Sequence, residues 1–389
     1  MKLDDLKKVH IVGIKGSGLS TLSAALRSRG IEVTGSDMQI SGHNADNVPR
    51  GIDCLIYTVA ASPDNPEIIQ AKNLGIPVYS YPEMLGLISK SMFTIAVAGT
   101  HGKTTTTNMI GRILTDADLE PLVIVGAPLQ GGGYMFGKGN YFVVEACEYK
   151  RSFLQIHPDI AVITNIDDDH LDYYKTHENI EHAFEEFVGN LKVGGKVIRD
   201  FENDDYRSKL NLKLPGEHNL HNAMLALSVA IAVGVEPGVA IESLNNFAGA
   251  ERRFEYKGKN NNGAIIFDDY AHHPTEVGAT IKGVKQKFPE LKLSVIFQPH
   301  LYSRTKEHLD GFVETLSLAD EVILVPIYAA REVDDLSISS ETLAQKIGTK
   351  AKVMSIEEAR EHLAYLSGGF VGMTMGAGDV YKISDGFKH

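Results

Sequence analysis

The sequence predicts an α/β protein of three domains: a Rossmann-like N-terminal domain, a central P-loop ATPase-type domain with a parallel sheet, and a Rossmann-like C-terminal domain. The chain has 389 residues, which is more than a single domain usually holds. Short apolar runs alternate with helical stretches along its whole length, as in parallel sheets. Glycine-containing turns follow several of the apolar runs. We expect the domains at residues 1–91, 92–248 and 249–389.

Each domain is expected to carry its own set of strands. In the first block we expect strands at 9–14, 31–35, 53–58 and 77–80, with helices at 18–29 and 66–73. In the second block we expect strands at 93–98, 122–125, 141–146 and 160–166, with helices beginning near 102 and at 178–191 and 218–233. The polar stretch 200–214 is expected to be a connection. In the third block we expect strands at 264–268, 293–297, 321–326 and 370–374.

Composition excludes several classes of protein. The formal net charge is -12, which argues against a general nucleic-acid binder, because phosphate neutralisation needs clustered Lys and Arg. No stretch approaches the roughly 20 apolar residues of a membrane span. The charged start Met1–Lys8 leads directly into a strand and is not expected to be a signal peptide. Cys54 and Cys147 make no disulfide framework, so a cytoplasmic location is expected.

The sharpest motif follows the strand expected at 93–98. It reads Ala98-Gly99-Thr100-His101-Gly102-Lys103-Thr104-Thr105. A strand before it and a helix after it give the context of a P-loop, whose backbone N–H groups bind phosphate. Lys103 would reach the β- and γ-phosphates of ATP, and Thr104 would bind Mg²⁺. The general motif has its first Gly at the position of Val97, and the alternative is a Gly-rich turn without a ligand.

Acidic side chains follow two other strands of the central block. Glu145 and Glu148 come at the end of one strand, and Asp167-Asp168-Asp169-His170 follow another. The carboxyl ends of parallel strands share one edge of the sheet, so these groups should lie near the P-loop. Mg²⁺ prefers oxygen ligands, and a few carboxylates suffice beside phosphate. The alternative is that these acidic groups belong to solvated loops or helix caps.

With these motifs in place, the sequence resembles the Mur ligase family. Besides the loop 99–105, the resemblance rests on motifs in family order along nearly the whole chain: Glu145-Ala146-Cys147-Glu148-Tyr149, Thr164-Asn165-Ile166-Asp167, Asp169-His170-Leu171-Asp172, His218-Asn219 with Asn222, Glu251-Arg252-Arg253-Phe254-Glu255, Asp268-Asp269-Tyr270-Ala271-His272-His273-Pro274-Thr275-Glu276, Gln298-Pro299-His300, Tyr302-Ser303-Arg304-Thr305 and Gly376-Ala377-Gly378-Asp379.

The resemblance implies an ATP- and Mg²⁺-dependent ligase of cell-wall synthesis. Among family members it is similar to those that join L-alanine to the lactyl carboxylate of UDP-N-acetylmuramate through an acyl phosphate. Two alternatives remain: a recycling ligase that attaches a ready-made murein tripeptide, and a catalytically silent nucleotide-binding homologue. No nucleic-acid or membrane partner is implied, and a monomer or weak homodimer is expected. The third domain is expected to close over ATP and the amino acid.

The resemblance also assigns roles to residues. The catalytic set is Lys103, Glu145, His170 and Arg253, and the metal ligands are Thr104, Glu145 and His170. ATP is expected to contact Gly99, Thr100, His101, Gly102, Lys103, Thr104, Thr105, His218, Asn219, Asn222, Arg253 and Asp269. The substrates are expected to contact Gly13, Gly16, Ser17, Gly18, Ser36, Asp37, His43, Tyr270, His272 and Arg304. Taken singly, His272 could be a structural histidine, Arg253 and Arg304 could be surface ion-pair residues, and the Gly13–Gly18 turn could bind nothing.

The chain departs from the family pattern at three positions near these sites. Family members usually have Asp where this chain has Cys147 and Lys150, and Arg where it has Leu301. The chain is also short for the family around 38–47 and 200–215. Position 301 bears on the amino-acid side of the site.

Overall fold

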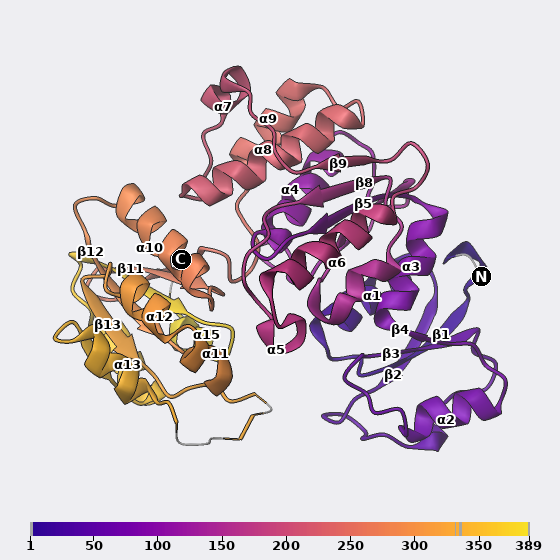
Figure 1. The fold of residues 1–389 in the computed structure, drawn as a ribbon, viewed down its shortest axis with the longest axis horizontal. Coiled ribbons are helices and arrows are strands. Elements are labelled where there is room, and N and C mark those ends of the chain that lie inside the picture. The colour runs from indigo at the N-terminus through magenta and orange to yellow at the C-terminus, as the bar shows by residue number, and fades with distance from the viewer. Residues whose placement is uncertain (1–2, 331, 334–336, 388–389) are drawn as a thin grey trace. The chain divides into compact units, whose positions relative to one another are not determined.

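Three separate β-sheets organise the molecule (Figure 1). The computed structural model describes residues 3–330, 332–333 and 337–387. The chain divides into two compact units: residues 1–128, 133–211 and 222–247 form the first, and residues 129–132, 212–221 and 248–389 form the second. The first unit contains two of the sheets and the second contains the third. No described helix has both the length and the apolar character that a membrane crossing needs.

The N-terminal sheet is fully parallel, with strand order β2-β1-β3-β4. Its strands are β1 (Lys8–Val12), β2 (Glu32–Ser36), β3 (Cys54–Tyr57) and β4 (Val78–Ser80). Its helices are α1 (Ser17–Ser28), α2 (Pro66–Asn73) and α3 (Tyr81–Ser91), with short 3-10 turns η1 (Leu3–Asp5) and η2 (Ala45–Asn47). The predicted Rossmann-like pattern is confirmed.

The central sheet is also parallel, with strand order β6-β7-β5-β8-β9. Its strands are β5 (Phe93–Ala98), β6 (Leu122–Ile124), β7 (Tyr141–Glu145), β8 (Ile160–Ile163) and β9 (Lys196–Ile198). The helices of this region are α4 (Lys103–Asp116), η3 (Tyr149–Gln155), α5 (Leu171–Tyr174), α6 (His177–Gly189), α7 (Asp204–Lys209), α8 (Glu217–Ala232) and α9 (Pro237–Asn246). Because β5 lies between β7 and β8, the segments that follow these three strands meet at one edge.

One continuous core joins the two sheets of the first unit. On the central side, Phe153 stacks on Phe187 with ring centroids 4.8 Å apart and meets Phe184 edge-on at 5.2 Å. Between the sheets, the hydroxyl of Thr21 on α1 donates to the carbonyl of Val125, 3.2 Å away. The N-terminal sheet is therefore fastened to the central sheet.

The C-terminal sheet has strand order β10-β11-β15-β12-β13-β14. Its strands are β10 (Glu255–Lys259), β11 (Ile265–Asp269), β12 (Lys292–Phe297), β13 (Glu321–Leu324), β14 (Ala351–Val353) and β15 (Phe370–Met375). Its helices are α10 (Pro274–Lys287), α11 (Tyr302–Glu307), α12 (Leu309–Leu316), α13 (Ser340–Ile347), α14 (Ile356–Tyr365) and α15 (Tyr381–Ser384). All neighbouring strands are parallel except β10, which pairs antiparallel with β11.

Three details differ from the sequence-based expectations. The stretch 200–214 is not only a connection, because it contains α7, whose charged sequence lacks an apolar period and whose N-terminus is capped by the side chain of Asn203. The edge strands β9, β10 and β14 were not expected. The strand expected at 160–166 ends at Ile163, because Thr164 and Asn165 turn to hydrogen-bond the loop after β5.

Candidate functional site

The loop between β5 and α4 depends on two glycines that have no room for a side chain. Gly99 has φ 138° and Gly102 has φ 82°, both in the region that L side chains rarely adopt. A Cβ at Gly99 would lie 2.0 Å from the hydroxyl of Thr164, and one at Gly102 would lie 2.6 Å from the side-chain oxygen of Asn222. The loop therefore packs directly against the ends of β8 and against α8.

Asn165 holds this loop by paired hydrogen bonds. Its side-chain oxygen accepts from the His101 N–H, and its side-chain nitrogen donates to the His101 carbonyl, both at 2.9 Å. The Thr100 N–H donates to the Asn165 carbonyl at 3.1 Å. The fixed loop precedes the N-terminus of α4, where backbone N–H groups and the helix dipole favour an anion.

Lys103, the first residue of α4, is bound within the loop. Its ammonium donates to the carbonyls of Gly99 and Thr100 at 2.5 and 2.9 Å, and lies 3.1 and 3.0 Å from the two oxygens of Glu148. Burial by itself would lower the pKa of Lys103, but the nearby Glu148 carboxylate more than offsets it, so the pKa is raised. Lys103 is therefore a fixed cation at neutral pH. Glu148 was expected at this edge among the carboxylates of a metal site, but not in an ion pair with Lys103.

Thr104 and Glu145 form a second contact beside Lys103. The Thr104 hydroxyl donates to Glu145 Oε2 at 3.0 Å, and the N–H of Gly126 donates to the same oxygen at 2.9 Å. Glu145 is the last residue of β7 and pairs with Val97 of β5 in register. The hydroxyl and the carboxylate are hard oxygen donors at the edge where phosphate would lie, so the pair fits Mg²⁺.

His170 lies at the same edge but contacts a different carboxylate. It precedes α5 with φ 55°, and its Nε2 lies 3.7 Å from Glu148 Oε1. Its ring centroid lies 4.7 Å from that of Tyr149. The structure thus brings Lys103, Glu148 and His170 together, with Thr104 and Glu145 beside them.

The N-terminal sheet gathers most of the other candidate substrate residues of the first unit. The N–H groups of Gly13 and Ile14 donate to the carbonyl of Ser36 at 2.8 and 3.1 Å. The Lys15 N–H donates to Asp37 Oδ2 at 3.1 Å. The turn that contains Gly13, Gly16, Ser17 and Gly18 is therefore tied to the end of β2.

His43 joins this region through a residue that the sequence did not single out. Its Nδ1 lies 2.9 Å from Oε1 of the buried Glu67, which also accepts from the Ser36 hydroxyl at 2.8 Å. Glu67 is the second residue of α2, and an acidic residue in a first helical turn suggests only a favourable helix start. The sequence pattern gives no sign that Glu67 is buried beside His43 and Ser36, and only the structure shows it.

The candidate residues of the second unit follow β11. Arg253 lies over the ring of Tyr270, with its guanidinium carbon 5.0 Å from the centroid. The Tyr270 and His272 ring centroids are 5.2 Å apart, and His272 Nδ1 lies 3.0 Å from the Tyr270 carbonyl. Asp269 is buried, and its two carboxylate oxygens accept from the N–H groups of Phe254 and Ala271, both at 2.8 Å.

Arg304 and Leu301 lie at the start of α11. Arg304 Nη1 is 3.4 Å from His300 Nδ1. Burial, and then the charge of Arg304, lowers the pKa of His300 to about 4, so this histidine is neutral at pH 7. Leu301 has φ 69°, which is a strained value for a branched side chain, and its N–H donates to the Tyr328 carbonyl at 2.9 Å. The strain marks the turn where the sequence departs from the family pattern.

The first turns of α8 carry the remaining candidates, His218, Asn219 and Asn222. Burial, with a smaller contribution from Arg253, lowers the pKa of His218, although Glu276 opposes the shift. The Asn219 side chain donates to the Pro215 carbonyl at 2.7 Å. His218 is therefore expected to be neutral at pH 7.

Family models match three successive parts of the chain. The model described as "Mur ligase family, catalytic domain" matches residues 8–92. "Mur ligase middle domain" matches residues 97–210, and "Mur ligase, glutamate ligase domain" matches residues 252–378. The UDP-N-acetylmuramate–L-alanine ligase of Clostridium acetobutylicum is 37% identical, over 100% of this chain and 98% of that protein.

The chain belongs to the Mur ligase family.

Solved structures of Mur ligases share its fold. The UDP-N-acetylmuramate–alanine ligase of Thermotoga maritima matches with a TM-score of 0.77 and 28% identity, over 97% of each chain. A murein peptide ligase of Psychrobacter arcticus matches with a TM-score of 0.66 and 25% identity, again over 97% of each chain. Both likenesses span the three domains of this Mur ligase.

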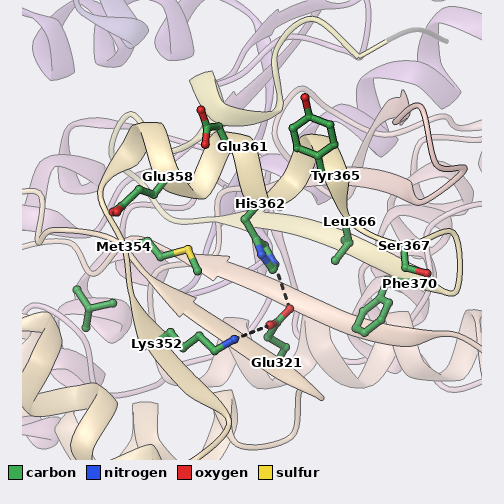
Figure 2. A pocket seen from close by; sticks show the side chains of 11 residues that line it. Glu321, Lys352, Met354, Glu358, Glu361, His362, Tyr365, Leu366, Ser367 and Phe370 are labelled. Atoms are coloured by element: carbon green, nitrogen blue, oxygen red, sulfur yellow. Dashed lines mark hydrogen bonds and ion pairs between the residues drawn. The ribbon is translucent and has the colours of Figure 1, made fainter.

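This Mur ligase also has a concavity of about 840 Å³ beside α14 (Figure 2). Glu321 is one of the residues that line it. Its Oε2 accepts from the Ser294 hydroxyl at 2.9 Å and lies 3.0 Å from His362 Nε2, and its Oε1 lies 3.6 Å from Lys352 Nζ. These contacts fasten α14 to the sheet. Glu321 begins β13, whereas Asp269 ends β11, so this concavity lies away from the strand ends that carry the candidate residues.

The Asp269 carboxyl predicts a pH-dependent stability. Burial raises its pKa from 3.8 to about 6, although Arg253 opposes the shift. The Asp269 carboxyl therefore binds its proton more tightly in the folded chain than in the unfolded chain. Its contribution to the free energy of unfolding is fully present below about pH 4 and is lost as the pH rises through about 6. Relative to Asp269→Asn, the parent should lose on the order of 3 kcal/mol across that window. Urea unfolding at stepped pH measures this, and parallel curves for the two proteins would show that Asp269 titrates normally.

Proposed function

We propose that this Mur ligase joins L-alanine to the lactyl carboxylate of UDP-N-acetylmuramate, at the expense of ATP, in peptidoglycan precursor synthesis. The observation that carries the proposal is the 37% identity to a UDP-N-acetylmuramate–L-alanine ligase over the whole chain and 98% of that protein. The site supports the proposal independently, because the loop after β5 has a fixed backbone and the Lys103 ammonium, which together suit the phosphates of a nucleoside triphosphate.

The chemistry follows from the weakness of a carboxylate as an acyl donor. A lactyl carboxylate oxygen attacks the γ-phosphorus of ATP and ADP leaves, which gives an acyl phosphate. The amine of L-alanine attacks the acyl carbon, a proton is lost from nitrogen, and inorganic phosphate leaves with the original carboxylate oxygen. The protein's part is to position these groups and to balance their charge.

The first unit supplies the groups for phosphate. On this proposal Lys103 exchanges its contacts with the loop carbonyls for contacts with the β- and γ-phosphates. Thr104 and Glu145 would hold Mg²⁺, and His170 would hold a second metal ion together with Glu148. Bound Mg²⁺ would neutralise charge on the transferring phosphoryl group. The turn from Gly13 to Gly18, with Ser36, Asp37 and His43, takes the UDP-sugar.

The second unit supplies the groups for the nucleotide and the amino acid. His218, Asn219 and Asp269 are proposed to contact the nucleoside of ATP. Arg253 adds a cation for phosphate. Tyr270, His272 and Arg304 are proposed for the amine substrate, with closure of the third domain excluding water from the acyl phosphate.

A recycling ligase is the second candidate function. The observation that favours it is the likeness to the murein peptide ligase of Psychrobacter arcticus, at a TM-score of 0.66. A catalytically silent homologue is disfavoured, because a protein that does no chemistry has no need for Lys103, Thr104, Glu145 and His170 together. The two kinds of ligase differ in the amine that they accept, so the amine that is incorporated distinguishes the two functions.

A substrate panel tests the proposal. Phosphate release is measured with ATP, Mg²⁺ and UDP-N-acetylmuramate, together with L-alanine, glycine, L-serine or murein tripeptide, and products are identified by mass. L-alanine should be the amine incorporated. Lys103→Ala should reduce the rate by on the order of 10²–10³-fold, because it removes a fixed cation from the phosphate site. Incorporation of the tripeptide alone would favour the recycling ligase, and no turnover with any amine would contradict the proposal.

The contact between Thr104 and Glu145 predicts a metal-dependent defect. Glu145→Ala should shift the Mg²⁺ titration of activity to higher concentration, because it removes a carboxylate ligand. Asp46→Ala, which removes a carboxylate from the N-terminal sheet region, serves as the control. If the titrations of Glu145→Ala and the parent superimpose, Glu145 does not bind the metal.

Because position 301 carries Leu, we expect a high KM for L-alanine. A guanidinium suits a carboxylate ligand, and Leu301 cannot donate from its side chain. One charge-assisted hydrogen bond is worth about 1.5–3 kcal/mol, or about ten- to hundredfold in affinity. Leu301→Arg should therefore lower KM for L-alanine and leave KM for ATP unchanged. An unchanged or raised KM for L-alanine would place position 301 away from the amino acid.

A further inference from the structure

Glu67 is a fully buried carboxylate at the edge of the N-terminal sheet. Its side chain has 0% exposure, although it is the second residue of α2, where acidic residues normally face solvent. No Lys or Arg is among its contacts within the described part of the chain. A buried charge without such a partner is costly, and an apolar side chain could fill the same space. Packing alone therefore does not explain why a carboxylate occupies this buried site.

Four side chains donate to this carboxylate from three separate segments. His10 on β1 places Nε2 2.8 Å from Oε2, and the Ser36 hydroxyl at the end of β2 lies 2.8 and 2.7 Å from the two oxygens. From the segment after β2, His43 Nδ1 and Asn47 Nδ2 lie 2.9 and 3.3 Å from Oε1. Glu67 thus links β1, β2 and the segment that contains His43.

The carboxylate is ionised at neutral pH. Burial by itself would raise its pKa, but the hydrogen bonds from His10, Ser36, His43 and Asn47 more than offset this and lower the pKa to about 2. An ionised carboxylate can only accept hydrogen bonds. The contacting nitrogens, Nε2 of His10 and Nδ1 of His43, must therefore both carry a hydrogen.

This requirement fixes the two faces of the His43 ring. Nδ1 is committed to Glu67, and within the described residues Nε2 makes no hydrogen bond. The His43 side chain is 20% exposed, whereas His10 is 2% exposed and its other nitrogen lies 2.9 Å from the Thr34 hydroxyl. Asn47 also donates to the carbonyl of Gly42 at 3.1 Å, which holds the residue before His43. Of the two histidines, only His43 reaches the surface with a ring nitrogen to spare.

We propose that Glu67 is the positioning residue of the sugar-nucleotide site: it holds His43 as the Nδ1–H form and presents Nε2 to the UDP moiety of the substrate. The inference rests on the proposed function, because it takes UDP-N-acetylmuramate as the ligand. Glu67 itself touches no substrate. It acts through His43, and through Ser36, whose carbonyl accepts from the Gly13 and Ile14 N–H groups of the glycine-rich turn.

Glu67→Gln tests the positioning role with little change of volume. The amide nitrogen of Gln donates, so it conflicts with the N–H of His10 or of His43. KM for UDP-N-acetylmuramate should rise by about ten- to hundredfold, while kcat and KM for ATP stay within about twofold of the parent. Glu83→Gln is the matched control, because Glu83 lies in the first turn of α3 in the same domain but belongs to an exposed capping box. It should leave all three constants unchanged.

His43→Asn gives a second test that spares the buried core. The Asn side chain can still donate to Glu67 in place of Nδ1, but it has no atom in place of Nε2. Sugar-nucleotide affinity, measured by calorimetry with UDP-N-acetylmuramate, should fall by about ten- to hundredfold with an unchanged melting temperature. Unchanged affinity in a folded His43→Asn protein would overturn the proposal, even if Glu67→Gln failed to fold.

Nitrogen NMR of histidine-labelled protein reads the tautomer without any substrate. In the parent, the His43 Nδ1 resonance should be that of a protonated nitrogen, and in Glu67→Gln the tautomer of His43 or of His10 should change. Spectra of both histidines that are the same in the two proteins would contradict the positioning role. If the parent fails to bind UDP-N-acetylmuramate, the proposed function and the ligand named here both fail. If the parent binds and turns over but both variants bind equally well, only this inference fails.

Discussion

Two contacts that only glycine permits determine the geometry of the phosphate loop. Gly99 lies against Thr164 at the end of β8, and Gly102 lies against Asn222 on α8. A Cβ at Gly99 would push the loop away from the end of β8, and a Cβ at Gly102 would collide with the side-chain amide of Asn222. Lys103 and Thr104 reach the edge shared by β5, β7 and β8 only because this packing holds, and it is this edge that carries Glu145, Glu148 and His170.

Charge is stabilised differently in the three regions. At the phosphate loop, the buried carboxylate of Glu148 pairs with the partly buried ammonium of Lys103, whose pKa is raised. In the C-terminal sheet, the carboxylate of Asp269 accepts from two backbone N–H groups, and burial raises its pKa to about 6 although the charge of Arg253 opposes the shift. Near β1, Glu67 accepts hydrogen bonds from several side chains, and these bonds lower its pKa to about 2. Each arrangement follows from the donors within hydrogen-bond distance, and not from burial alone.

The sequence predicted the fold class, most of the parallel strands and the loop 99–105, because these depend on local pattern: apolar period, glycine and the order of elements. It did not predict β10 or α7, which are polar and short and gain their form from neighbouring segments. It also missed Glu67, and it missed the ion pair of Glu148 with Lys103. Their importance arises from partners 57 and 45 residues away, such as His10 and Lys103, which no local pattern reveals.

We propose that transfer of the γ-phosphoryl group at the Lys103 loop activates the carboxylate of the sugar nucleotide. An isotope experiment follows this transfer with UDP-N-acetylmuramate that carries ¹⁸O in both oxygens of its lactyl carboxylate. After turnover with ATP and L-alanine, the released phosphate is examined by mass spectrometry. Each released phosphate should carry one ¹⁸O atom, and the amide product should carry the other. Unlabelled phosphate accompanying amide formation would contradict activation as an acyl phosphate, because the carboxylate oxygen would then never have been bonded to phosphorus.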